Sequence, residues 1–183
     1  MKRLTVASIL VTVLIFILEF NFQPPYILIA FTSVAFIFLT YYLIGVLQFA
    51  QEKIAIQTPF SIFLGIEIIA FVGGLLSSAL KSEMMINTSF GMINIILIVY
   101  ILIMTLQVKN SLLAKPYKFL GTALIIMAAI KLIIPFSAPA SHDIPSYIGY
   151  INLADVIPLF AILNIINKTN KILQSDAPPL ITN

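Results

Sequence analysis

Six long apolar stretches, separated by short polar segments, constrain the fold of this chain more than any other feature. A helix needs roughly 20 apolar residues to cross the hydrocarbon core of a bilayer. The stretches that meet or nearly meet this length are 4–21, 26–47, 60–80, 89–107, 119–136 and 149–167. The sequence therefore predicts an all-α fold, a polytopic integral membrane helical bundle in which residues 1–183 form a single transmembrane domain of about six helices.

The composition agrees with this prediction. Of the 183 residues, 61% are hydrophobic and only 9% are charged, whereas soluble domains carry about 25% charged residues. The pI is near 9.2, but the basic residues flank the apolar stretches, as they do in membrane proteins. We therefore expect the lipid bilayer as a partner and no nucleic acid.

The basic residues also predict an orientation. If the N-terminus is cytoplasmic, the outer loops hold a single basic residue, Lys81, and Lys131 falls within a span. The other basic residues then lie in cytoplasmic segments: Lys2, Arg3, Lys53, Lys109, Lys115, Lys118, Lys168 and Lys171. This split follows the positive-inside rule. It predicts cytoplasmic N- and C-termini, with the bacterial inner (plasma) membrane as the location.

The first stretch has a second interpretation. A short basic start, Met1-Lys2-Arg3, followed by an apolar run also describes a secretory signal peptide. No small-residue cleavage site follows Phe20. We therefore expect an uncleaved first span.

A weak internal repeat connects two pairs of spans. Residues 41–48 match residues 100–107 at five of eight positions, and Pro59-Phe60 is echoed by Pro116-Tyr117. Both prolines are expected in the first turn of their helices, where a missing N–H is not needed. The pattern predicts a parallel hairpin repeat, with spans two and three corresponding to spans four and five. The alternative is chance matching, because Leu, Ile and Tyr are frequent in this chain.

Small residues are concentrated in the third span. Helices in lipid associate by close packing at small residues. Residues of this kind, several of them four apart, are Ala70, Gly73, Gly74, Ser77 and Ser78. They predict a helix-packing face and place the third span at the centre of the bundle, with Gly121 in the fifth span as a weaker equivalent.

Charged residues inside spans are candidate functional residues, because a charge in hydrocarbon is costly unless it is paired or hydrated. At 1.5 Å per residue, Lys131 and Asp155 lie about 8 and about 9 Å from the outer ends of consecutive antiparallel spans. Their matching depth and opposite charge predict an ion pair, and Asn94 lies at a similar depth. Glu19, near the outer boundary, is expected to reach the headgroups.

Glu67 is placed apart from that pair, about 10 Å from the cytoplasmic boundary of the third span. Tyr41 and Tyr42 on the second span come to a similar depth. Two hypotheses follow for this carboxyl group. It is hydrogen-bonded to a tyrosine and joins two helices, or it faces a polar cavity and takes part in function.

The residues of common enzyme sites are missing. The chain has no cysteine and one histidine, which excludes thiolate sites and the paired ligands of haem or zinc. Asp155 is the only aspartate in a span, which excludes a pair of catalytic aspartates. We expect no metal, no cofactor and no catalytic residues, so a non-catalytic protein is favoured over an enzyme.

Two functional hypotheses remain. The first is a non-catalytic membrane protein, either a subunit of a membrane complex, with another membrane protein or a second copy as partner, or a binder of a lipid or small apolar molecule. The alternative is a small transporter or channel, with Glu67 as its coupling carboxyl and Lys131/Asp155 as an intramembrane ion pair. This alternative requires water to reach Glu67.

Overall fold

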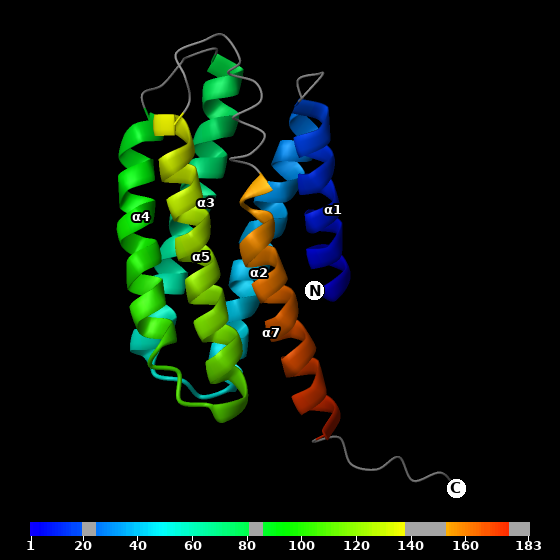
Figure 1. Cartoon of the computed structure of the whole chain (residues 1–183), viewed down its shortest axis with the longest axis vertical. Coiled ribbons are helices and arrows are strands. Elements are labelled where there is room, and N and C mark those ends of the chain that lie inside the picture. Colours follow the sequence, from blue (N-terminus) through cyan, green and yellow to red (C-terminus); the bar gives the residue numbers. More distant parts are fainter. Residues whose placement is uncertain (20–24, 81–85, 138–152, 176–183) are drawn as a thin grey trace, which may run out of the picture.

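The computed structural model describes residues 1–19, 25–80, 86–137 and 153–175, with the backbone alone at 74, 76–80, 86–94, 134–137 and 174–175. All regular secondary structure in these residues is helical. The helices are α1 (Lys2–Glu19), α2 (Tyr26–Phe49), α3 (Ile54–Leu80), α4 (Ile86–Thr105), α5 (Ser111–Ser137) and α7 (Val156–Ser175). Figure 1 shows them running side by side along the long axis of the molecule.

The helices form a closed ring in chain order. Each helix from α1 to α5 contacts the next one, and α7 contacts both α5 and α1, which closes the ring. A smaller contact between α2 and α7 crosses it. Residues from distant parts of the sequence, on α3, α5 and α7, are thereby brought around one interior.

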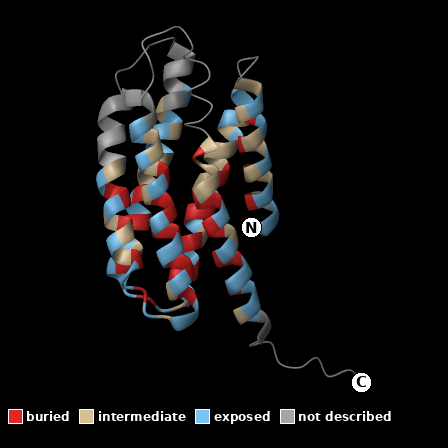
Figure 2. Cartoon of the chain, viewed as in Figure 1, coloured by how far each residue is buried: buried red, intermediate tan, exposed pale blue. Residues whose placement is uncertain are grey.

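In the described part of the chain, four helices are long and apolar enough to cross a membrane. These segments are Tyr26–Phe49, Ile54–Gly73, Ser111–Ile133 and Val156–Leu173, and Ile95–Thr105 is a shorter apolar helix. Large apolar side chains on these helices, such as Ile27, Ile69 and Phe119, are exposed on the outside of the bundle, where Figure 2 shows much of the exposed surface. The apolar helices and their apolar exterior indicate a helical membrane protein.

The best-defined part of the core lies where α2, α3 and α5 meet. Tyr117 is completely buried, and its hydroxyl donates a hydrogen bond of 2.7 Å to the carbonyl oxygen of Leu43. Its ring packs edge-on against Phe60, with the ring centroids 6.0 Å apart. The tyrosine hydroxyl therefore has a partner inside the core, as a buried polar group requires.

The third and fifth helices begin earlier than the sequence predicted, at Ile54 and Ser111 instead of 60 and 119. Pro59 and Pro116 are each the sixth residue of a 27-residue helix, so their placement in the first turn was wrong. Ile56 and Leu113 are buried. Their packing stabilises the added residues at the starts of α3 and α5, although each proline lacks a backbone hydrogen bond. The shared helix length and proline position are consistent with the hairpin repeat, which stays a prediction.

A buried carboxylate, which the sequence did not single out, joins the two loops at one end of the bundle. Glu52 lies between α2 and α3, and its Oε1 atom accepts hydrogen bonds from the backbone N–H groups of Lys109 (2.9 Å) and Asn110 (2.7 Å). The side chain of Asn110 caps the start of α5 by accepting from the N–H of Leu112. These contacts fix the starts of α3 and α5 relative to each other.

The small residues predicted to form a packing face on α3 are described only in part. Ala70 is exposed, and a Cβ atom added to Gly73 would meet nothing within 4 Å. The surroundings of Gly74 and the side chains of Ser77 and Ser78 lie outside the described residues. A packing face made by these residues, with α3 at the centre of the bundle, therefore stays a prediction.

The backbones of two helices approach each other closely at Gly121, where α5 crosses α4. A Cβ atom added there would overlap the Oγ1 atom of Thr105 and come within 3.2 Å of the Cα atom of Leu102. On α1, a second compact face is made by Thr5, Ser8 and Thr12, all buried. Each hydroxyl donates to the carbonyl oxygen four residues earlier, so these polar groups are satisfied inside their own helix.

Candidate functional site

Lys131 and Asp155 form the ion pair that the sequence predicted. The Nζ atom of Lys131 lies 2.6 Å from the Oδ1 atom of Asp155, and each side chain is 35% exposed. The two residues come from elements that pack directly against each other, α5 and the start of α7. Opposite charges at this distance stabilise one another in a setting where either one alone would be costly.

The position of Asp155 in its helix differs from the prediction. The last span was expected to begin at 149, which would place Asp155 inside a helix, but α7 begins at Val156. Asp155 therefore immediately precedes the first turn of α7. A carboxylate at this position also interacts favourably with the positive end of the helix dipole.

The carboxyl of Glu67 lies near this ion pair, which the depth estimate did not predict. It is partly buried on α3, and its carboxyl lies within electrostatic range of both Lys131 and Asp155. Two features explain the difference. The early start of α3 places Glu67 at the middle of its helix, and a helical side chain such as Lys131 points back toward the start of its helix, which is toward the level of Glu67.

The three side chains form a charged cluster, which we call the Glu67–Lys131–Asp155 cluster. They come from α3, α5 and the start of α7, three elements that the ring of helices brings around its interior. Lys131 is paired with Asp155 and lies within electrostatic range of the carboxyl of Glu67. With all three charged, the cluster carries one net negative charge, which a proton or a monovalent cation would balance.

The other predicted site residues are not brought into this cluster. Tyr41 is 67% exposed and lies on the outer side of α2. Tyr42 has a side-chain hydrogen bond with Thr169 on α7. The side chain of Asn94 lies outside the described residues. Among the described residues, no contact supports the hypothesis that Tyr41 or Tyr42 holds the Glu67 carboxyl.

Within the part of the chain that the structure describes, no group of three or more His, Cys, Asp or Glu side chains is placed to hold a metal ion. Among the described side chains, the cluster also has no nucleophile beside a general base, the arrangement that covalent catalysis requires. Its chemistry is that of charge balance: it can hold a proton or a cation, or exchange one partner of an ion pair for another.

Comparison with known proteins assigns no role to these residues. No protein-family model, no curated protein and no solved structure matches the chain.

Proposed function

We propose that this protein is a small membrane transporter or channel in which the Glu67–Lys131–Asp155 cluster binds and passes on a proton or a monovalent cation. The observation that carries the proposal is the convergence of three ionisable side chains from three different helices or helix ends. Ionisable groups inside spans are rare, and in transporters they line ion pathways and proton relays.

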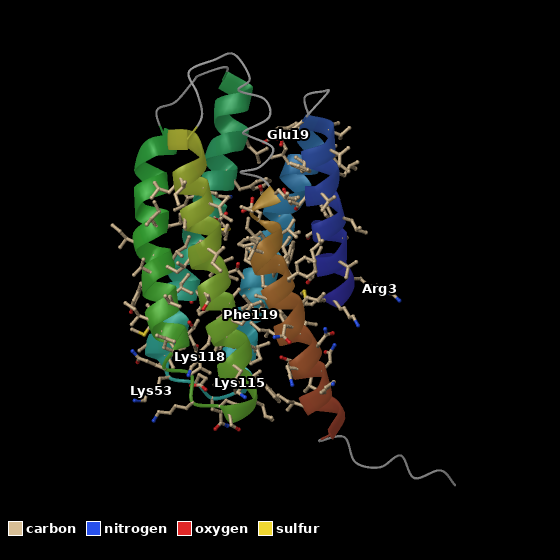
Figure 3. The ribbon with its side chains drawn as sticks, in the orientation of Figure 1. Arg3, Glu19, Lys53, Lys115, Lys118 and Phe119 are labelled. Atoms are coloured by element: carbon tan, nitrogen blue, oxygen red, sulfur yellow. The ribbon has the colours of Figure 1, made fainter. Side chains whose placement is uncertain are left out.

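The proposed topology places all six helices across the membrane, with both termini in the cytoplasm. Support comes from the lysines at the starts of α3 and α5, since Figure 3 shows Lys53, Lys115 and Lys118 at one end of the bundle and Glu19 toward the other. The bacterial inner membrane remains the proposed location. In this topology the cluster lies between the two surfaces, where a coupling site is expected.

The proposed mechanism uses the ion pair as an exchangeable partner. With Lys131 bound to Asp155, Glu67 is the surplus carboxyl and takes up the proton or cation. Transfer of Lys131 from Asp155 to Glu67 would free Asp155 to hold the proton instead. The cluster thus offers two alternative arrangements of one ammonium and two carboxyl groups, which is the minimum that a relay needs.

A second candidate, the non-catalytic subunit of a membrane complex, is supported by a different observation. Gly65 and Gly73 on α3 face open space, and Ala70 between them is exposed. Small residues on an outer helix face allow the backbone of another transmembrane helix to approach closely. Purification in mild detergent with a stoichiometric second protein would favour this candidate.

Replacement of Glu67 by Gln tests the transport proposal. Purified protein is reconstituted in vesicles that contain a fluorescent dye for H⁺, Na⁺ or K⁺, one ion in each experiment, and ion flux is started with a membrane potential. We expect E67Q to lower the flux of the conducted ion by about tenfold or more, since losing even one 1.4 kcal/mol interaction from the rate-limiting step has that effect.

The matched control is Glu19→Gln, which removes a carboxyl from α1, a helix whose main contacts are with α2 and α7. E19Q is expected to conduct like the unmodified protein. Equal flux in unmodified protein and E67Q, or no flux of H⁺, Na⁺ or K⁺ above that of empty vesicles, would contradict the proposal.

A further inference from the structure

The described surface at the proposed cytoplasmic end of the bundle presents exposed lysines and no exposed carboxylate. Lys53, Lys109, Lys115 and Lys118 are all exposed around the starts of α3 and α5, and Figure 3 shows three of them at this end. Among the described residues here, the one carboxylate is Glu52. It is buried and is bound to two backbone N–H groups. The lysines therefore lack an acidic neighbour on this described surface.

Two of these lysines, Lys115 and Lys118, are followed along α5 by exposed apolar residues. Lys115, Phe119 and Ile126 are separated by four and seven residues, about one and two helical turns, so they lie on one face of α5, and all three are exposed. Leu112, which is also exposed, precedes Lys115 by three residues, and Lys118 follows it by three. The opposite face of α5 is buried, as Tyr117 and Leu120 show. The exposed face thus changes from cationic to apolar along the helix.

This order, lysines first and apolar residues after them, matches the order of headgroup and acyl chains in a phospholipid of one membrane leaflet. A phosphate at the headgroup level would accept hydrogen bonds from Lys115 and Lys118, and its acyl chain would run along Phe119 and Ile126. A soluble acidic partner would match the lysines but not the apolar residues, because these continue along α5 toward the level of the bundle's middle. Charge and apolarity together select a lipid.

We propose that the face of α5 formed by Leu112, Lys115, Lys118, Phe119 and Ile126 is a binding site for an anionic phospholipid. The site depends on the membrane location of the helices and does not depend on the transport proposal. An anionic lipid gains attraction from each lysine near the surface, whereas a zwitterionic lipid carries its own balancing charge. The site therefore discriminates between headgroups.

The absence of tryptophan from the chain provides a direct test. Phe119 is half-exposed, so Phe119→Trp places a single fluorescent reporter at the site. The protein is reconstituted with lipids whose acyl chains are brominated, because bromine quenches tryptophan on contact. Quenching by brominated phosphatidylglycerol is compared with quenching by brominated phosphatidylcholine over a range of mixtures, which yields the relative affinity for the two lipids.

We expect phosphatidylglycerol to be preferred by about fivefold or more at low salt, as one or two lysines near a phosphate allow. The preference should shrink as salt screens the lysines. In the background of Phe119→Trp, the double change Lys115→Gln and Lys118→Gln should bring the ratio close to one. Both lysines are exposed, so these changes leave the core intact, and an unchanged unfolding temperature verifies this.

Ile27→Trp is the matched control, because Ile27 is exposed at the start of α2, at the opposite end of the bundle, with no lysine in its described turn. It should show no headgroup preference. The proposal is overturned if Phe119→Trp is quenched equally by both lipids, or if the lysine changes leave the preference unaltered. It is also overturned if inorganic phosphate removes the preference more strongly than chloride at equal ionic strength, since the site would then bind free phosphate.

Discussion

Lys131→Met should destabilise the protein more than Asp155→Asn, even though each change removes one half of the same ion pair. Removing Lys131 leaves two carboxyl groups, Asp155 and Glu67, without a cation. Removing the charge of Asp155 leaves Lys131 with Glu67 still in electrostatic range. Because the pair is about one-third exposed, we expect a loss of about 2–3 kcal/mol for K131M and about 1 kcal/mol for D155N.

The double variant K131M/D155N separates the effect of an unpaired charge from the effect of the pair itself. It removes both charges, and its stability should lie above that of K131M. Adding Glu67→Gln to K131M should also recover stability, because it removes one of the two repelling carboxyl groups. The free energy of unfolding in a mild detergent, titrated with a denaturing detergent, measures all of these variants.

Two outcomes would contradict this description of the cluster. Equal losses for K131M and D155N would mean that Glu67 does not interact with the lysine. A K131M/E67Q double variant that is less stable than K131M alone would mean that the carboxyl groups do not repel each other after the lysine is removed.

Gly121→Ala is expected to lower the free energy of unfolding by about 1–3 kcal/mol, the range for adding a methyl group to a closely packed site. The added Cβ atom would overlap the hydroxyl oxygen of Thr105, and it would also approach the backbone of Leu102. A side chain can rotate away, but the α4 backbone cannot move without separating the two helices. The loss should therefore persist, in part, when Thr105 is also changed to Ala.

Gly65→Ala is the matched control for Gly121→Ala. Gly65 ends a Phe-Leu-Gly triplet at 63–65 that recurs at 119–121, where it ends in Gly121. A Cβ atom added at Gly65 meets nothing within 4 Å. Alanine is the better helix former of the two residues, so G65A should show no loss of stability. If G65A and G121A unfold at the same detergent concentration, the close α4–α5 crossing described above is not present in the protein.

Features that depend on one helix, or on two consecutive helices, were predictable from the sequence. The positions of the helices follow from apolar length, because a helix in lipid must satisfy its own backbone. The Lys131–Asp155 pair was predictable because consecutive helices pack side by side and their depths can be counted from a shared loop. The ion pair is present even though α7 begins at Val156, after the predicted start of the span.

Features that depend on distant helices were not predictable. The position of Glu67 relative to Lys131 follows from the ring of helices, which no short-range pattern reveals. Glu52 meets Lys109 and Asn110 across 57 and 58 residues of chain. The close α4–α5 contact at Gly121 likewise follows from the tertiary arrangement, because small side chains permit close packing in several directions.

If the Glu67–Lys131–Asp155 cluster binds and passes on a proton or a cation, water must reach Glu67 inside the bundle. The chain has no native cysteine, so Glu67→Cys and Ile69→Cys each introduce a single thiol on α3. Ile69 is 60% exposed on the outside of the bundle, where lipid would cover it. A charged, membrane-impermeant thiol reagent should modify E67C in vesicles about tenfold faster than I69C, since the reactive thiolate forms in water and not in hydrocarbon. Modification of E67C at the rate of I69C or slower would contradict the transport proposal.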